Sequence, residues 1–228
     1  MFHTGRKRTT VARIVRPPAF PCLQYYETSM TRMTHNSLAA AIFSGRPVGI
    51  AASIMRAALV YGMNAIDLTA GNGNDTLLLA RLCAPGHVFG IDIQPDAVVA
   101  TEKLLEENHS KATVICADHA RLFEIIPREF HGRIHGVMAN LGYLPGGDST
   151  VVTQPESTIT ALNLAAMLLA KNGLMTVVCY NGHAGGPEEA EAVADWSAHL
   201  PADSFTAQRI SILNRPNLPP ELVVVRRI

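Results

Sequence analysis

The residues best suited to chemistry follow short apolar segments of the chain. The first group is Asp67-Leu68-Thr69-Ala70-Gly71-Asn72-Gly73-Asn74-Asp75-Thr76, in which Gly71 and Gly73 let the main chain come close to a ligand. It leads into a predicted helix, whose first N–H groups favour an electron-rich partner. Thr76 stands where the dinucleotide pattern G-x-G-x-x-G has its third glycine, which weakens an NAD interpretation. Asp67, Asp75 and Thr76 join the glycines as candidate cofactor-binding residues.

A carboxylate also ends each of the next two apolar segments. Asp92 lies 19 residues beyond Gly73 and can accept hydrogen bonds from both hydroxyls of a ribose, as in sites for NAD and for S-adenosylmethionine. Asp118 and His119 are placed to meet the edge of an adenine. Asp67 and Asp118 could instead be helix caps or turn residues, and His119 could act as a base, although we favour a positioning role. Three acids at three successive segment ends indicate a nucleoside ligand.

The fourth and fifth segments end in groups suited to a substrate. Asn140 offers an amide oxygen to a nucleophilic amine, and Tyr143 offers a face for stacking. For His183 the sequence favours neither of two interpretations, a proton acceptor or a hydrogen-bonded loop residue. In the alternative interpretation Asn140 caps a turn and Tyr143 is packing. We take these three as candidate catalytic residues, and no Cys or His spacing predicts a metal site.

The elements that must position these residues alternate in type. Strands are predicted at 64–68, 86–92, 113–117, 134–139 and 174–179. Helices are predicted at 36–43 and 50–60, and then at 75–82, from 95, at 120–126, at 155–172 with Gly173 as the C-terminal cap, and at 187–199. Five βα repeats predict an α/β fold with parallel strands and helices on both faces. Ligands of such sheets bind outside the carboxyl ends of the strands, where every candidate residue lies.

The last part of the chain has a different pattern. Residues 205–212 and 222–226 are two predicted strands with no helix between them, joined by the Asn- and Pro-rich stretch from Asn214 to Pro220. Such a pair can form an antiparallel hairpin at the edge of the sheet. A parallel α/β sheet closed in this way is the layout of class I methyltransferases, whereas dinucleotide dehydrogenases usually continue with another βα unit.

Together these segments resemble the rRNA methylase family of bacterial class I methyltransferases. The matching stretches are Ala65 to Leu79, Val88 to Gln94, Asn140 to Asp148 (NLGYLPGGD, the most specific), Gly182 to Gly186, and Asn214 to Pro220. The match runs from about residue 34 onward. It implies a Rossmann-like, mostly parallel seven-stranded sheet with a C-terminal antiparallel hairpin, and S-adenosylmethionine as cofactor.

The resemblance also implies a reaction: N-methylation of the 5-aminomethyl group of a wobble (2-thio)uridine in the anticodon loop of tRNA. The alternatives are a small-molecule amine methyltransferase, an rRNA methyltransferase, and a nucleic-acid-binding module without activity.

Roles for single residues follow from the same resemblance. The resemblance implies that Asn72 and Asn74 contact the methionine part of the cofactor. Asp92 and Gln94, with Ile93 between them, would contact the ribose region. Asp118 and His119 would contact the adenine. The Asn140-Leu141-Gly142-Tyr143 segment stands in the place of the N-P-P-Y signature of amino-methylating enzymes, without its prolines. Thr69 replaces the first glycine of the cofactor motif.

Charge divides the 228-residue chain into two unlike parts. It has 19 basic and 19 acidic residues, but residues 1–32 contain six Lys or Arg and one acid, Glu27. The remainder is therefore acidic, which excludes a protein that coats nucleic acid through a broad cationic surface. A single-stranded loop can still be bound by base stacking and a few arginines, for which Arg209, Arg215, Arg226 and Arg227 are candidates.

The same composition sets expectations for organisation and location. We expect one methyltransferase domain at 33–228, preceded by a basic, loosely ordered extension at 1–32, for which an organellar transit peptide is the weaker alternative. The longest apolar runs are far below the ~20 residues of a membrane span, and the four cysteines are scattered, as in reduced cytoplasmic proteins. The oligomeric state, a homodimer included, is left open by the sequence.

Overall fold

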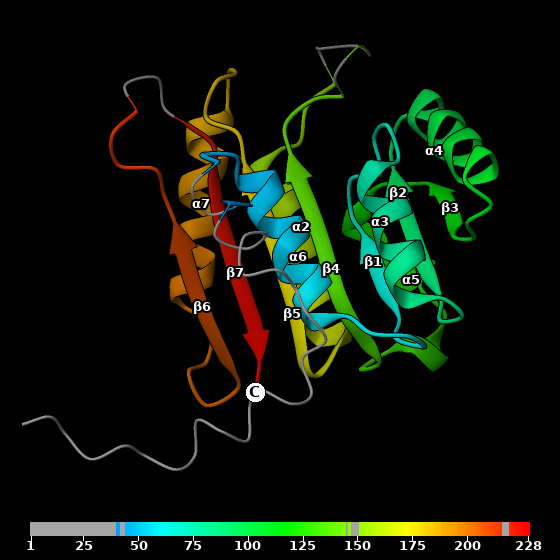
Figure 1. The fold of residues 1–228 in the computed structure, drawn as a ribbon. Coiled ribbons are helices and arrows are strands. Elements are labelled where there is room, and N and C mark those ends of the chain that lie inside the picture. The colour runs from blue at the N-terminus through cyan, green and yellow to red at the C-terminus, as the bar shows by residue number, and fades with distance from the viewer. Residues whose placement is uncertain (1–39, 42–43, 145, 147–150, 216–218) are drawn as a thin grey trace, which may run out of the picture. The chain divides into compact units, whose positions relative to one another are not determined.

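The protein contains a seven-stranded sheet. The structure, a computed structural model, describes residues 40–41, 44–144, 146, 151–215 and 219–228. The strands are β1 (Ala65–Asp67), β2 (Val88–Asp92), β3 (Thr113–Cys116), β4 (Ile134–Leu141), β5 (Leu169–Cys179), β6 (Phe205–Ile210) and β7 (Glu221–Arg227). Their order is β3-β2-β1-β4-β5-β7-β6 (Figure 1). The first five strands are parallel, and β7 is antiparallel to both β5 and β6. The predicted fold class is confirmed.

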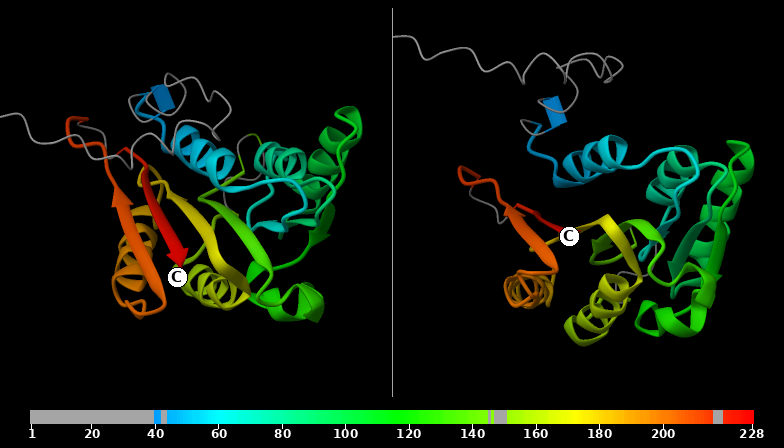
Figure 2. Two further views of the ribbon diagram at one scale, coloured as in Figure 1. Left: turned by 60° about the horizontal axis from the view of Figure 1, so that its bottom comes forward. Right: turned by 90° about the horizontal axis from the view of Figure 1, so that it is seen from below.

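Helices cover both faces of this sheet. They are α2 (Pro47–Ala58), α3 (Asn74–Cys83), α4 (Pro95–Glu107), the short α5 (Leu122–Ile125) between the 3-10 turns η2 (His119–Arg121) and η3 (Arg128–Phe130), α6 (Pro155–Leu168) and α7 (Gly186–Ala198). α2 and α3 lie on one face, and α6 and α7 on the other (Figure 2). Proline stands within the first two positions of α2, α4, α6 and α7, where its missing N–H removes no helical hydrogen bond.

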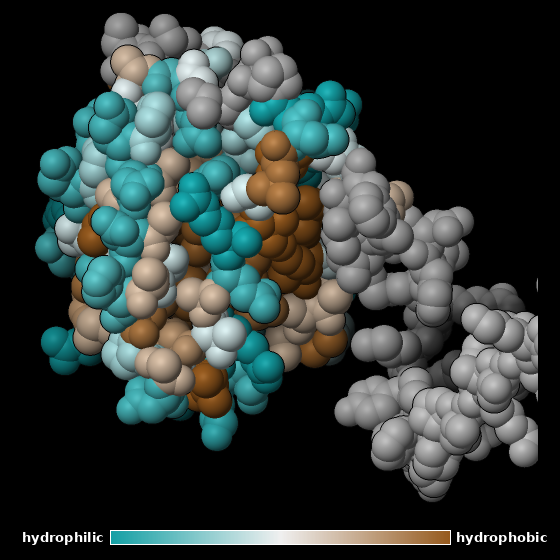
Figure 3. Space-filling model, turned by 90° about the vertical axis from the view of Figure 1, so that its left-hand side faces the viewer, coloured by the Kyte–Doolittle hydropathy of each residue, from teal (hydrophilic) through white to brown (hydrophobic). Residues whose placement is uncertain are grey.

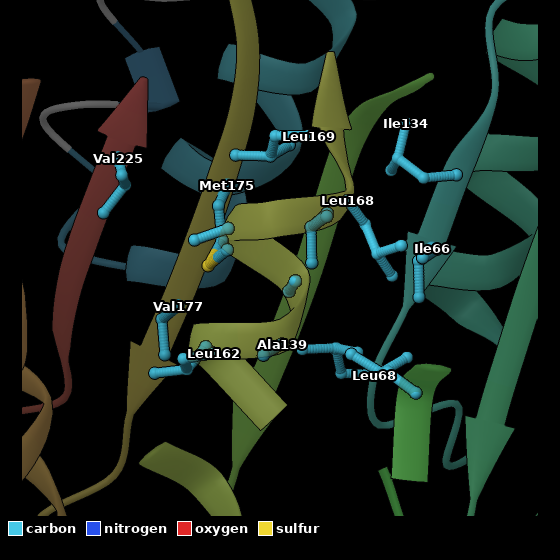
Figure 4. Packing of buried hydrophobic residues seen from close by; sticks show 14 of the residues in the cluster. Ile66, Leu68, Ile134, Ala139, Leu162, Leu168, Leu169, Met175, Val177 and Val225 are labelled. Carbon is cyan, nitrogen blue, oxygen red and sulfur yellow. The ribbon is translucent and has the colours of Figure 1, made fainter. Parts of the chain in front are cut away.

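The core follows from the two-residue period of the strands. Along β4, Val137 and Ala139 pack on the side of α6, while Met138 between them packs on the side of α2. On the α6 side, Leu162 and Leu168 of the helix meet the side chains of the central strands (Figure 4). These strands are buried on both faces, so their carboxyl ends are held rigidly where the candidate site residues begin.

The boundary between α6 and β5 differs from the prediction. The helix ends at Leu168 and the strand begins at Leu169, so the predicted helix over 169–172 is wrong. Gly173 is no helix cap: a Cβ there would lie 2.9 Å from the carbonyl oxygens of Ala170 and Ile134. The register between β4 and β5 shifts at this point. Pairing with β4 therefore ends the helix earlier than its apolar sequence indicates.

Smaller differences concern the ends of elements. α2 begins at Pro47 rather than residue 50, β4 continues two residues further than expected to Leu141, and the helix predicted at 120–126 is divided between η2 and α5. The helix predicted at 36–43, apart from Ala40 and Ala41, and the boundary at residue 32 lie outside the described residues.

The edge strand β6 carries polar side chains on its open side. Thr206, Gln208 and Arg209 are exposed, while Phe205, Ala207 and Ile210 are half-buried. Viewed from this edge, hydrophilic residues cover most of the surface and hydrophobic residues gather in one area (Figure 3). Polar and charged side chains on an edge strand disfavour pairing with a second sheet.

The described residues also bear on cysteines, metals and membranes. Cys83, Cys116 and Cys179 are free thiols. Among the described residues no group of His, Cys, Asp and Glu could hold a metal ion, and no helix there is long and apolar enough to cross a membrane.

Candidate active site

A cavity of about 680 Å³ opens at the carboxyl ends of the parallel strands. Its volume is within the range of roughly 300–1,000 Å³ typical of small-molecule sites. Most of the predicted site residues line it: Gly71, Asn72, Asn74, Asp75, Asp92, Ile93, Gln94, Asp118, His119, Asn140 and Tyr143. Residues from four strand ends, far apart in the sequence, are therefore brought to one cavity, as the βα pattern predicts.

Three predicted residues lie behind the β1 loop instead of in the cavity wall. The carboxyl of Asp67 is fully buried and accepts hydrogen bonds from the Thr69 N–H (3.1 Å) and the Thr76 hydroxyl (2.6 Å). Gly73 has φ 82°, and a Cβ there would lie 2.9 Å from the Cα of Thr101 in α4. Asp67, Gly73 and Thr76 thus support the loop after β1 on the side away from the cavity. A glycine is required at residue 73 for this loop to pack on α4.

Asp92 at the end of β2 is held by the backbone. One carboxylate oxygen accepts from the Gly71 N–H (2.8 Å) and the other from the Gln94 N–H (3.0 Å). A carboxylate has about four lone-pair positions, so both oxygens can still accept ligand hydroxyl groups. Asp92 therefore joins the β1 loop to the β2 end and has its carboxylate on the cavity.

Asp118 and His119 combine structural and cavity-lining positions. Asp118 accepts the Ala120 N–H (2.8 Å) and so caps η2, which is the alternative the sequence left open. His119 Nδ1 lies 3.2 Å from the Leu68 carbonyl oxygen. This contact fixes the ring at the cavity wall, an arrangement that fits positioning better than proton transfer.

Asn140 is fixed on two sides. Its backbone N–H donates to the Thr69 hydroxyl (2.8 Å), and its side-chain Nδ2 donates to a carboxyl oxygen of Asp75. The remaining amide oxygen, Oδ1, is buried and has no hydrogen-bond partner among the described residues. A buried acceptor without a donor costs free energy, about 1–3 kcal/mol, unless a ligand satisfies it.

Two carboxyl groups near Asn140 have raised pKa values. Burial, followed by the charge of Asp75, raises the pKa of Asp67 to about 7. Burial also raises the pKa of Asp75, although the hydrogen bond from Asn140 and the charge of Arg56 act in the opposite direction. Perturbed carboxyl groups beside a cavity are typical of functional sites.

His183 lies outside the cavity lining. Its Nδ1 contacts the Ala184 carbonyl oxygen at 3.0 Å, and its ring meets that of Tyr143 edge to face at 6.1 Å between centroids. His183 Nε2 is buried without a hydrogen-bond partner among the described residues, and a Cβ on Gly142 would lie 3.2 Å from it. The structure therefore places His183 as a support for the 142–143 segment.

Several lining residues were not predicted as site residues. Tyr180, 38% exposed, faces the cavity together with Tyr143, 51% exposed, and Thr69, Thr153, Glu156 and Ser157 also line it. Tyr180 follows the β5 strand directly, so the strand-end rule that selected Asn140 could have found it. Thr153 and Ser157 carry no such signal, because Ser157 lies in the first turn of α6 and Thr153 lies just before that helix, away from any strand end.

The arginines predicted to contact RNA are differently placed. Arg209 forms a salt bridge with Glu221, and Arg226 donates to the side chain of Asn172. Arg226 pairs with Leu174, five residues before the carboxyl end of β5, and Arg227 donates to the carbonyl of Leu169 at the start of that strand. The two C-terminal arginines therefore do not border the cavity.

Comparison with known proteins identifies the family. The model of the family described as "Putative rRNA methylase" matches residues 88–226. The chain belongs to this family. A solved structure described as a "putative rRNA-methylase" from Clostridium thermocellum has 37% identity and a TM-score of 0.76, and the match covers 80% of this chain and 98% of that one. A second, described as "a putative methyltransferase" from Streptococcus mutans in complex with SAH, has 31% identity and a TM-score of 0.73, and the match covers 80% of this chain and 98% of that one.

A curated relative has a more specific name. The chloroplastic tRNA (mnm(5)s(2)U34)-methyltransferase of Arabidopsis thaliana is 35% identical over 177 residues, which are 73% of this chain and 64% of the relative. This chain thus spans less than two thirds of that protein's length.

Proposed function

We propose that this protein is an S-adenosylmethionine-dependent methyltransferase that methylates the 5-aminomethyl group of a wobble uridine in tRNA. The observation that carries the proposal is the buried Oδ1 of Asn140, which has no hydrogen-bond partner among the described residues and belongs to a residue that lines the cavity. An amine N–H is the donor this acceptor lacks. The name of the Arabidopsis relative supports this reaction, and the SAH in the Streptococcus structure supports the cofactor.

The cavity residues fit the cofactor. Asp92 and Gln94 would hold the ribose, Asp118 and His119 the adenine, and the loop from Gly71 to Asn74 the methionine part. Such a loop needs close backbone approach, which Gly71 with φ 53° allows. When bound, S-adenosylmethionine supplies a methyl group on a positively charged sulfur.

The chain's own residues then position the amine. Asp75 holds the Nδ2 of Asn140, so that Oδ1 is the atom left to accept an amine N–H. Tyr143 and Tyr180 at the cavity offer faces for the uracil ring. An ammonium must lose a proton before it attacks; because His183 does not line the cavity, we assign that proton to water. Fixing an unprotonated amine in line is the main contribution available to the protein.

A labelling experiment tests the reaction. The protein is incubated with radiolabelled S-adenosylmethionine in three separate reactions. One contains bulk tRNA from a strain lacking the activity, one contains rRNA from that strain, and one contains small primary amines. The tRNA product is digested to nucleosides. Label in 5-methylaminomethyl-(2-thio)uridine is expected. Label only in rRNA or only in small amines would replace the proposal by that activity, and binding of SAH without any transfer would favour a module without activity.

Replacement of Asn140 by Ala tests the positioning step. We expect turnover to fall by about 10²-fold or more, the scale of lost positioning, with SAH affinity unchanged. Asn163→Ala is the matched control, because Asn163 lies on α6 and bonds to Trp196, outside the cavity lining. Near-normal turnover of Asn140→Ala would remove Asn140 from the mechanism.

A further inference from the structure

A buried carboxylate on α7 is connected to the 142–143 segment by hydrogen bonds. Glu189 is 2% exposed and accepts the hydroxyl protons of Thr153 (2.7 Å) and of Thr158 in α6 (2.6 Å). The Thr153 hydroxyl in turn accepts the N–H of Gly142 (2.8 Å), and the Thr153 N–H donates to the Gly142 carbonyl (2.9 Å). Gly142 lies two residues after Asn140 and directly before Tyr143.

The direction of each bond in this chain is determined. A hydroxyl has one proton, and Thr153 gives it to Glu189, so the oxygen must face the Gly142 N–H as an acceptor. Glu189 lies in the first turn of α7, where the helix dipole favours negative charge, and no salt bridge to it is present among the described residues. Among the described residues, the hydrogen bonds that link Glu189 to Gly142 run through Thr153.

The same segment is supported from a second side. A Cβ on Gly142 or on Gly186, the first residue of α7, would lie 3.2 or 3.1 Å from His183 Nε2. The ring of His183 stands edge-on to Tyr143. Thr153 therefore holds the backbone of Gly142 by two hydrogen bonds, and His183 occupies the space beside the Cα of Gly142.

We propose that Glu189 is a positioning residue for the substrate: through Thr153 it fixes Gly142, and so sets the placement of Asn140 and Tyr143. This rests on the proposed function for its catalytic consequence. Glu189 touches neither the cavity nor the cofactor residues, so its effect should fall on the use of tRNA and not on the binding of SAH.

Four substitutions separate positioning from general stabilisation. Glu189→Leu removes both acceptor oxygens, so the Thr153 hydroxyl loses the group that takes its proton and can turn that proton toward the Gly142 N–H. Thr153→Val removes the acceptor, Thr153→Ser keeps it, and Thr158→Val breaks only the bond between Glu189 and α6. Thr158→Val is thus the matched control, losing one hydrogen bond of the same carboxylate without touching Gly142.

The catalytic readout is the kcat/KM for tRNA beside the Kd for SAH. We expect Glu189→Leu and Thr153→Val to lower kcat/KM by roughly 10- to 100-fold, the scale of a misplaced reacting group, with the Kd for SAH within about twofold of wild type. The kcat/KM of Thr153→Ser and that of Thr158→Val should both lie within about threefold of the wild-type value. Equal losses in Glu189→Leu and Thr158→Val, or no recovery by Thr153→Ser, would overturn the proposal.

A second readout needs no substrate. The amide proton of Gly142, followed by NMR hydrogen exchange, should exchange at least about tenfold faster in Glu189→Leu and Thr153→Val, but not in Thr158→Val. Trp196, the single tryptophan, bonds to Asn163 of α6, so its fluorescence reports on α6–α7 packing and should be unchanged. Unchanged exchange of the Gly142 amide proton would refute the role of Glu189, whether or not the wild-type protein methylates tRNA. Failure of the wild-type protein to methylate tRNA would refute the proposed function separately.

Discussion

The carboxyl group of Asp67 is fully buried, and two hydrogen-bond donors do not cancel the cost of charging it. Its pKa rises from 3.8 to about 7. The folded protein therefore binds the Asp67 proton more tightly than the unfolded chain does between these pH values. The stability that this proton confers is complete below about pH 4 and is lost as the pH rises through about 7.

Asp67→Asn should remove this pH dependence, because the amide stays neutral throughout. We expect the free energy of unfolding of wild type to fall relative to that of Asp67→Asn by at least about 1 kcal/mol between pH 4.5 and pH 8, since one pKa unit corresponds to about 1.4 kcal/mol. Urea unfolding of both proteins across this range measures the difference. Parallel stability curves would show that Asp67 titrates in the folded protein as it does in the unfolded one.

Gly73 and Gly62 offer a comparison of two glycines in the same backbone region. Their φ values are 82° and 83°, but a Cβ at residue 73 meets the backbone of Thr101, whereas at residue 62 nothing lies within 4 Å. Gly62→Ala should cost about 1 kcal/mol, the cost of a left-handed non-glycine residue. Gly73→Ala should cost about 1–3 kcal/mol more through overpacking.

Cofactor affinity distinguishes these two variants further. Gly73→Ala should weaken SAH binding in calorimetry, because the β1 loop must move away from α4, while Gly62→Ala should not. Equal unfolding midpoints and equal SAH affinities for the two variants would contradict the packing role of Gly73.

The strand-end rule found much of this site from sequence alone. Asp92, Asp118 and Asn140 line the cavity because each lies at or just beyond the carboxyl end of a parallel strand, and these ends meet at one edge of the sheet. The rule cannot separate residues that face the cavity from those behind it, and His183 and Thr76 fall in the second group. The bonds of Glu189 to Thr153 and Thr158 depend on how α6 and α7 pack, which no local pattern encodes.

At the scale of elements, α2 packs on the sheet through Ile50, Ala51 and Met55 and through Leu59, the residue that follows it. A Cβ on Gly136 of β4 would lie 2.8 Å from Leu59 Cδ1. We expect Gly136→Ala to destabilise the protein by about 1–3 kcal/mol, as overpacking does. In a Leu59→Ala background, which alone costs about 2–5 kcal/mol, the added methyl has room.

A double-mutant cycle on these residues measures the contact. Chemical unfolding of the two single variants and the double variant should give a coupling energy of about 0.5–3 kcal/mol, with Gly136→Ala less harmful once Leu59 is truncated. Additive effects would mean that Gly136 does not determine how closely α2 approaches β4.

The boundary between α6 and β5 shows where sequence reasoning stops at this scale. Leu168 and Leu169 are both fully buried, one ending a helix and the other beginning a strand. An apolar run satisfies either period, so only pairing with β4 decides where the helix ends. Strand β7, in contrast, was predictable, because Leu222 to Val225 form an apolar run too short for a helix.

At the scale of the whole molecule, charge separates residues 1–32 from the rest. The resemblance to the family starts after this basic stretch, so we expect its deletion to leave SAH affinity and methyl transfer to tRNA within about twofold of the full chain. Filter binding of tRNA at two salt concentrations is the measurement, because phosphate contacts weaken steeply with salt. A deletion that lowers tRNA affinity and flattens its salt dependence would instead make the stretch a functional RNA-binding arm.

The place of β7 in the sheet has a consequence during synthesis. Ribosomes make this strand after the other six, yet it lies between β5 and β6 and joins them. Until Glu221 to Arg227 emerge, β5 has an open hydrophobic edge and β6 has no partner in the sheet. Nascent chains stalled before Glu221 are therefore the species most exposed to aggregation and most in need of a chaperone.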